Sequence, residues 1–180
     1  MKINEKITIS DFNEQWKYQF EEEKRLIQQS LPNLHIEHIG STSVKGMIAK
    51  PIIDIMVGTK LYPPPDNIIA SLEHLGFYSF GEIDAVNGRY YFVKRGKIDC
   101  NLHIVLHLGS LWENNIDFRN YLIAYPKSAS AYSALKRNLI EQGKDTLLEY
   151  SRQKEEMINY IFKKIKTLSK GDSVPRKLKD

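Results

Sequence analysis

The fold of this chain is decided by the stretch HIGSTSVKGMIAKPIIDIMV, residues 38–57. It opens with small residues around Gly40 and Ser41 and ends in an apolar run that contains one carboxylate, Asp54. Gly and Ser are typical of turns, and a short run of Ile, Met and Val is typical of a β-strand. The stretch therefore predicts a loop of small residues leading into a strand that carries a single acidic side chain.

Strand alternation separates Asp54 from its apolar neighbours. Successive side chains of a strand point to opposite faces, so Ile53 and Ile55 share one face and Asp54 shares the other with Met56. The segment 98–107 alternates in the same way, and its polar face comprises Asp99, Asn101, His103 and His107. Such a strip is most often the solvent side of a strand. If the two strands are neighbours, however, the strip meets Asp54 at a metal or phosphate site.

Hydrophobic periodicity predicts the elements around this stretch. They are a helix over 10–31 capped by Ser10 or Asp11, strands over 35–39 and 52–58, a helix over 66–76, and two strands within 88–110. Three helices follow, over 112–125, 128–142 and 145–168. The fold class is therefore α+β, with a mixed sheet and flanking helices followed by a C-terminal helical bundle. The expected domains are an α/β core over 1–108, a helical annex packed on it over 109–168, and a flexible basic tail over 169–180.

Each of the last three helices carries a basic residue where its apolar stripe predicts a hydrophobic one. These residues are Arg119, Lys136 and Lys154. A single case is best explained by snorkelling, in which the aliphatic stem covers apolar surface and the charge reaches water. Three cases together favour a shared anionic partner, either an internal carboxylate such as Asp54 or the phosphates of a bound nucleotide.

Composition and charge limit the class of protein. The 180 residues are 42% hydrophobic and 27% charged, with a net charge of +4, as in an ordinary globular chain rather than a disordered one. The longest apolar run is too short to span a bilayer, and the first residues do not resemble a secretory signal. The only cysteine, Cys100, excludes an internal disulfide framework and favours a cytoplasmic location, with Cys100 in the core.

The Gly-Ser loop has the chemistry of a phosphate-binding loop. Gly40 lets a backbone approach a ligand closely, and hydroxyl groups follow at Ser41, Thr42 and Ser43. The alternative is a tight connection between two elements with no ligand. Asp54 likewise has a structural alternative, an ion pair with Lys50 or with Arg119.

The segment EHIGSTSVKGMIAKPIIDIMV, residues 37–57, resembles the signature of the GrpB family, which is placed in the nucleotidyltransferase superfamily with a DNA polymerase beta-like palm. The resemblance continues through LHIVLH, FRNYLIAYP, AYSALKRNL and YSRQKEEMINYI. It implies a nucleotidyltransferase-like sheet in which Gly40 and Ser41 match the superfamily's Gly-Ser pair. Asp54 then matches the first metal carboxylate, and Met56 stands where the second is expected.

The resemblance also implies a function, the binding of a nucleoside triphosphate with Mg²⁺ and transfer of a nucleotidyl group. The acceptor is left open among a small molecule, a protein and RNA, and no membrane partner is expected. The predicted catalytic residues are Asp54 and His103, a histidine that matches the family signature, and the predicted metal ligands are Asp54 and Asp99, which lies on the polar strip and could replace the ligand missing at Met56. The predicted phosphate-binding residues are Gly40, Ser41, Thr42, Ser43 and Lys50, joined by the three basic residues of the helix stripes, Arg119, Lys136 and Lys154. Because a thioether is a poor magnesium ligand, Met56 favours the alternative of a non-catalytic nucleotide- or phosphate-binding module.

Overall fold

The structure is a computed structural model that describes residues 6–84 and 88–171. Its helices are α1 (Gln15–Ser30), α2 (Asp66–His74), α3 (Ser110–Ala124), α4 (Pro126–Glu141), α5 (Leu147–Gln153) and α6 (Glu155–Gly171), with a 3-10 turn η1 (Ser41–Ser43). Its strands are β1 (His35–Ile39), β2 (Ile53–Thr59), β3 (Tyr78–Asp84), β4 (Arg89–Lys94) and β5 (Cys100–Leu106). The α+β class predicted from the sequence is confirmed.

The five strands form one mixed sheet in the order β1-β2-β5-β4-β3. The central pair, β2 and β5, is parallel, and the other neighbouring pairs are antiparallel. In the central pair Asp54 lies opposite Asn101, and Met56 lies opposite His103. The two strands with polar positions are therefore direct neighbours and their polar faces coincide, as the convergence predicted from the sequence requires.

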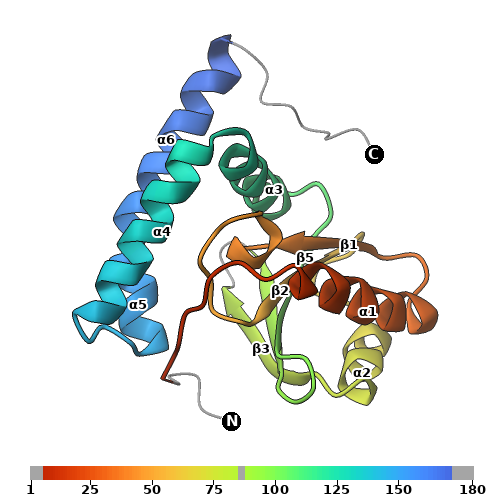
Figure 1. Ribbon diagram of the computed structural model, residues 1–180. Coiled ribbons are helices and arrows are strands. Elements are labelled where there is room, and N and C mark those ends of the chain that lie inside the picture. The colour runs from red at the N-terminus through yellow and green to blue at the C-terminus, as the bar shows by residue number, and fades with distance from the viewer. Residues whose placement is uncertain (1–5, 85–87, 172–180) are drawn as a thin grey trace.

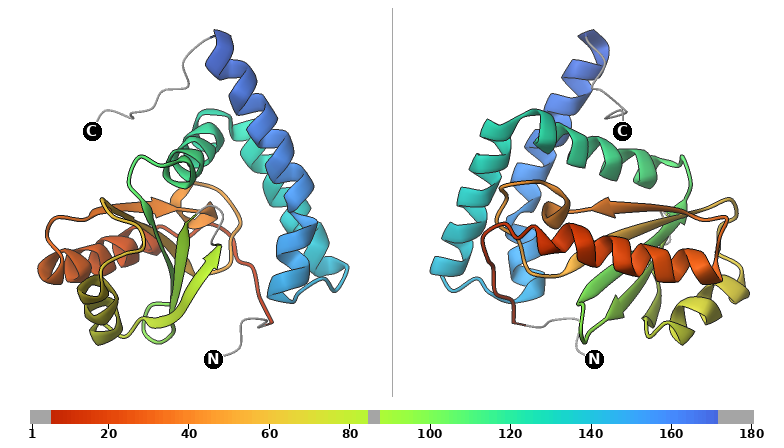
Figure 2. Two further views of the ribbon diagram at one scale, coloured as in Figure 1. Left: turned by 180° about the vertical axis from the view of Figure 1, so that it is seen from behind. Right: turned by 45° about the vertical axis from the view of Figure 1, so that its right-hand side comes forward.

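Helices cover both faces of the sheet (Figures 1 and 2). On the apolar face of β2, α1 and α2 pack against a core that includes Ile53, Ile55 and Val57. On the opposite face, Trp112 of α3 packs with Met56 and with residues of β1 and β5. The alternation in β2 thus sends its isoleucines into the main core and leaves Asp54 on the α3 side.

The helical end of the chain encloses the Gly-Ser loop. Figures 1 and 2 show α4 and α6 side by side as two long helices beside the sheet. Their apolar cluster includes Val44 and Met47 from the loop between β1 and β2, in addition to residues of α3, α4 and α6. The loop is therefore held between the sheet and the C-terminal helices. The division into domains at residue 108 stays a prediction.

Three local predictions need correction. The first helix begins at Gln15, whose backbone N–H bonds to Asn13 Oδ1 at 2.9 Å, and Ser10 instead forms an isolated bridge with Ala49. The third predicted C-terminal helix is interrupted at Lys154, which separates α5 from α6. Strand β3 was not predicted, because it is a half-exposed edge strand interrupted by Gly81 and lacks the apolar alternation of a core strand.

Helix α6 continues to Gly171, and the remainder of the predicted tail, 172–180, lies outside the described residues. Within the ranges that the structure describes, none of the helices combines the length and the apolar character needed to cross a membrane.

Candidate functional site

Most of the residues predicted as a site line one cavity of about 130 Å³ between the Gly-Ser loop, β2 and the C-terminal helices. Its lining residues are Gly40, Ser41, Thr42, Ala49, Lys50, Asp54, Tyr132, Lys136, Tyr150 and Lys154. The cavity thus unites residues that lie far apart in the sequence. Ala49 and the two tyrosines are the members that the sequence did not single out as site residues.

Gly40 and Asp54 are in close contact at the base of this cavity. Gly40 has a φ of +72°, and a Cβ atom there would lie 2.4 Å from Asp54 Oδ2. Only glycine fits, because any side chain would collide with the carboxylate and would also strain the backbone. The Gly-Ser loop is therefore built around the Asp54 carboxylate.

A hydrogen-bond chain holds the other oxygen of Asp54. Asn101 Nδ2 donates to Asp54 Oδ1 at 2.9 Å, and Tyr91 Oη donates to Asn101 Oδ1 at 3.0 Å. Arg95 Nη2 also donates to Asn101 Oδ1, at 3.2 Å. The neighbouring strands thus fix Asp54 through an amide, and the alternative of an ion pair between Asp54 and Arg119 is not what the structure shows.

Lys136 reaches the cavity from α4 and is only 2% exposed. Its Nζ donates to Ser41 Oγ at 2.9 Å and to the backbone oxygen of Ile48, and it lies 4.9 Å from the centre of the Tyr132 ring. Burial lowers the pKa of Lys136 to about 7; the neighbouring Lys154 lowers it further and Asp54 opposes the change. Snorkelling does not describe this residue, because its charge is directed inward.

Lys154 enters the same cavity from the C-terminal end of α5. Its Nζ lies 4.3 Å from the centre of the Tyr150 ring, so it repeats the arrangement of Lys136 over Tyr132. Burial lowers the pKa of Lys154 to about 8, with Lys50 adding to the effect and Asp54 opposing it. The Tyr and Lys residues four positions apart in α4 and α5 are therefore two cation–π pairs directed at one site.

Tyr150 adds a polar group that sequence reasoning missed. The residue is 1% exposed, and its hydroxyl has no hydrogen-bond partner among the described residues. A buried hydroxyl is normally paired. The signal in the sequence was the position of Tyr150 one turn before Lys154, but that position alone also fits an ordinary core residue.

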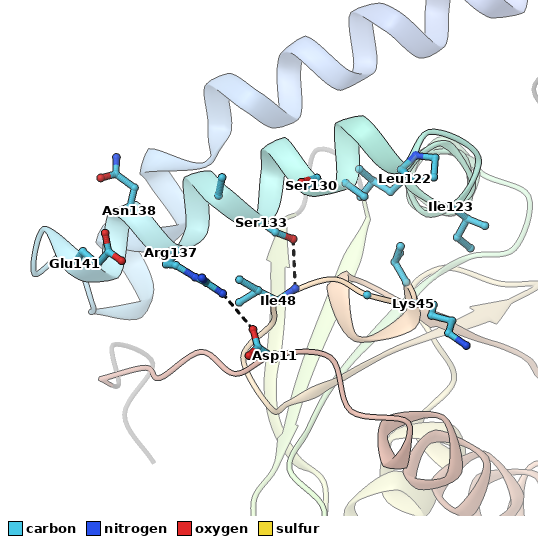
Figure 3. Close-up of a pocket in the computed structure, with 15 residues that line it drawn as sticks. Asp11, Lys45, Ile48, Leu122, Ile123, Ser130, Ser133, Arg137, Asn138 and Glu141 are labelled. Carbon is cyan, nitrogen blue, oxygen red and sulfur yellow. Dashed lines mark hydrogen bonds and ion pairs between the residues drawn. The ribbon is translucent and has the colours of Figure 1, made fainter.

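Helix α4 holds the loop through the backbone of Ile48. Ser133 Oγ accepts from Ile48 N at 3.3 Å, while Lys136 bonds to the oxygen of the same residue. Figure 3 shows the first of these contacts and the ion pair of Arg137 with Asp11 at 3.2 Å. These residues border a larger pocket of about 620 Å³, and none of the predicted site residues lines it.

Two predicted phosphate-binding residues lie outside the small cavity. Arg119 Nη1 pairs with Glu37 Oε2 at 2.6 Å and donates to the backbone oxygen of His38 at 2.9 Å, so its charge is already neutralised on β1. Ser43 Oγ donates to the oxygen of Gly40 at 2.6 Å and closes the turn of the loop. Both line a neighbouring pocket beside α1 instead.

The predicted ligands Asp99 and His103 are also elsewhere. Asp99 Oδ1 accepts from Gly96 N at 2.9 Å in the turn before β5, and the residue borders a separate cavity. His103 stacks on Tyr91 with ring centres 5.1 Å apart, and burial lowers its pKa to about 4, so the imidazole is neutral. Neither residue lines the cavity that contains Asp54, and their catalytic and metal roles stay predictions.

The donor groups at the cavity do not fit a two-magnesium centre. Asp54 is the single carboxylate in its lining, which also holds three lysines. Met56 is fully buried in an apolar cluster, and the amide of Asn101 stands beside Asp54 on β5. In residues 6–84 and 88–171, no group of three or more His, Cys, Asp or Glu side chains could hold a metal ion. Mg²⁺ prefers several oxygen ligands, and three ammonium groups oppose a further cation.

Known proteins match the sequence of this chain over most of its length. The family model described as GrpB protein matches residues 6–164. UPF0157 protein YqkA of Bacillus subtilis is 33% identical over 169 residues, covering 92% of this chain and 49% of the relative, so this chain spans about half of that relative's length. Glutamate-rich protein GrpB of Alkalihalophilus pseudofirmus is 30% identical over 164 residues, covering 87% of this chain and 94% of that protein.

Solved structures agree with the sequence comparison. The crystal structure of GrpB from Enterococcus faecalis matches with a TM-score of 0.79 and 31% identity, over 90% of this chain and 99% of that chain. A structure of the Cid1 poly(U) polymerase matches with a TM-score of 0.47 and 11% identity, over 66% of this chain and 41% of that chain, a likeness too weak to inform on the site. The family resemblance carried by residues 37–57 is confirmed: the chain belongs to the GrpB family.

Proposed function

We propose that this chain binds a phosphate-bearing ligand whose phosphate group enters the 130 Å³ cavity, with a nucleoside triphosphate as the ligand class expected from the family resemblance. The observation that carries the proposal is the convergence of Lys50, Lys136 and Lys154 from three separate segments on a single carboxylate, Asp54. Buried cations are normally paired with anions. A cavity with more ammonium groups than carboxylates is therefore suited to an anionic ligand.

The cavity's size limits what it can hold. A volume of about 130 Å³ corresponds to roughly four water molecules. That is room for one phosphate group and not for a base and sugar, so the rest of a nucleotide would lie outside the cavity. Charge-assisted hydrogen bonds from the lysines each contribute about 1.5–3 kcal/mol to the binding of such a group.

A second candidate function is transfer of a nucleotidyl group to an acceptor, which is still open among a small molecule, a protein and RNA. The position of Asp54 against Gly40 favours it, because this is the carboxylate that the resemblance assigns to the metal. The lining of the cavity, with one carboxylate and three lysines, opposes transfer because it does not fit a two-magnesium centre. A cytoplasmic location, in reach of nucleotides, also stays a prediction.

Thermal unfolding with each of the four ribonucleoside triphosphates, in EDTA and in magnesium, tests the proposal, since a ligand that binds the folded state raises the melting temperature. We expect a rise with at least one triphosphate that is smaller in Lys154→Met. The matched control is Lys97→Met, because Lys97 is exposed and pairs with Glu22 at 3.2 Å, away from the cavity. If no triphosphate raises the melting temperature, the proposal that this chain binds a phosphate-bearing ligand is wrong. A rise only in magnesium that disappears in Asp54→Asn would favour the transferase instead.

A further inference from the structure

We infer that phosphate recognition in this cavity is independent of metal ions and is coupled to proton uptake, with the ammonium groups of Lys136 and Lys154 and the hydroxyl of Tyr150 contacting the phosphate directly. The inference rests on the proposed function and deepens it. It names the ligand group as a phosphate dianion and assigns the role of a divalent cation to the lysines of the cavity.

The charges in the cavity support this assignment. With every lysine protonated, three ammonium groups face one carboxylate, which leaves two positive charges in excess. Asp54 is held by the amide of Asn101, a neutral group, so the cavity's cations are the groups available to compensate an anion. A phosphate dianion would neutralise the excess without a metal ion.

The geometry of the donors gives a second, independent reason. A lysine ammonium has three N–H donors, and two of those of Lys136 are used by Ser41 and Ile48. Lys154 Nζ lies over the Tyr150 ring, and the buried hydroxyl of Tyr150 has no hydrogen-bond partner among the described residues. These three residues line one cavity, so together they present polar donors suited to a ligand with several acceptor oxygens.

Proton coupling follows from the crowding of the amines. Burial and mutual repulsion lower the pKa of Lys136 to about 7 and that of Lys154 to about 8. An anion beside these groups raises their pKa again, because it favours the charged form. Binding between those values and the ordinary value for lysine therefore takes up protons, and affinity falls as pH rises.

Isothermal titration of the full chain with inorganic phosphate, pyrophosphate and ATP tests these points. Each titration is run in EDTA and in magnesium, at about pH 6.5 and about pH 9, in buffers of different ionisation enthalpy. For inorganic phosphate we expect equal affinity in EDTA and magnesium, and for pyrophosphate and ATP no gain in affinity from magnesium. We also expect proton uptake at the higher pH and a loss of about tenfold per pH unit for each proton taken up. Binding of inorganic phosphate alone would mark a free phosphate site, whereas tighter ATP binding would mark the terminal phosphate of a nucleotide.

Tyr150→Phe separates a ligand-binding hydroxyl from a structural one. We expect about tenfold weaker phosphate binding together with a higher melting temperature of the ligand-free protein, because an unpaired buried hydroxyl is removed. Lys97→Met should change neither value. Unchanged affinity in Tyr150→Phe would remove that hydroxyl from the ligand contacts.

The two proposals fail in different ways. Phosphate binding that requires magnesium, or that takes up no proton at high pH, would overturn this inference and leave the proposed function standing. No binding of any phosphate compound under either condition would overturn both.

Discussion

Two lysines directed into the protein, the partly buried Lys94 on β4 and the buried Lys136 on α4, have opposite surroundings. Lys94 Nζ bonds to both carboxylate oxygens of Glu23 at 2.9 Å, and it lies 5.2 Å from the centre of the Phe77 ring. Lys136 is more deeply buried, yet its hydrogen-bond acceptors are the neutral oxygens of Ser41 and Ile48. Both also contact an aromatic ring, so the difference between them is the carboxylate.

The presence or absence of a bonded carboxylate separates a structural lysine from a lysine suited to binding a ligand. The Glu23–Lys94 pair is complete within the protein and joins α1 to the sheet, so it needs no ligand. Lys136 is instead held near Lys154, which adds repulsion where Lys94 has attraction. A buried charge is stable only when it is compensated, and Asp54, the carboxylate that opposes the lowering of the Lys136 pKa, is shared among the three lysines of the cavity.

The largest effect is expected when the complete pair is broken. Lys94→Met should lower the free energy of unfolding by about 3 kcal/mol, because it leaves the Glu23 side chain, 4% exposed, without its partner. Lys136→Met should cost much less stability and abolish phosphate binding. Urea unfolding followed by circular dichroism measures the first and titration calorimetry the second. Equal stability losses in the two variants would show that the two lysines have the same structural role.

The second largest effect is expected when the close contact between Gly40 and Asp54 is disturbed. Gly40→Ala should cost about 2 kcal/mol through backbone strain and the clash with Asp54, and it should displace the carboxylate and weaken phosphate binding. Gly46→Ala is a matched control, because Gly46 has a φ of +80° and no atom within 4 Å of an added Cβ. It should show only the strain, about 1 kcal/mol. If both variants bind phosphate equally well, the close contact of Gly40 with Asp54 is not part of the site.

A smaller effect is expected for Lys154, whose Nζ lies over the Tyr150 ring. Lys154→Met should weaken phosphate binding about tenfold, the value of one charge-assisted hydrogen bond, with little change in unfolding free energy. Lys97→Met provides the baseline for loss of an exposed charge. Calorimetric titration of both variants with phosphate at one pH compares their affinities. Equal affinities would place Lys154 outside the site.

The pH dependence of stability gives the smallest expected effect. The pKa of Lys136 is about 7 in the folded chain and lies below its value in the unfolded chain, so between the two the unfolded state binds more protons. Stability from this group therefore rises as pH increases above about 7, by roughly 1 kcal/mol after damping by the effective dielectric. Urea unfolding at a series of pH values should show a weaker rise in Lys136→Met. An identical profile in both proteins would contradict the burial of a titrating amine.

Much of the site could be predicted from local periods in the sequence. The alternation of β2 placed Asp54 opposite the isoleucines of the core, and the helical spacing directed Lys136 toward the interior, as the structure confirms. These predictions succeed because the periods of strands and helices follow from backbone geometry. The Gly-Ser loop was recognisable because close backbone approach at Gly40 excludes a side chain.

The tertiary structure alone decided which charge meets which partner. Arg119 has the same helical signal as Lys136, yet it finds Glu37 on β1, and Asp99 has the alternation of Asn101, yet it closes a turn. Tyr150 acquires its unpaired hydroxyl only where α5 packs against the cavity. The sequence by itself determined the faces on which these groups lie, because a face depends on neighbouring residues in the chain. Their partners come from distant segments, and only the packing of helices on the sheet brings those segments together.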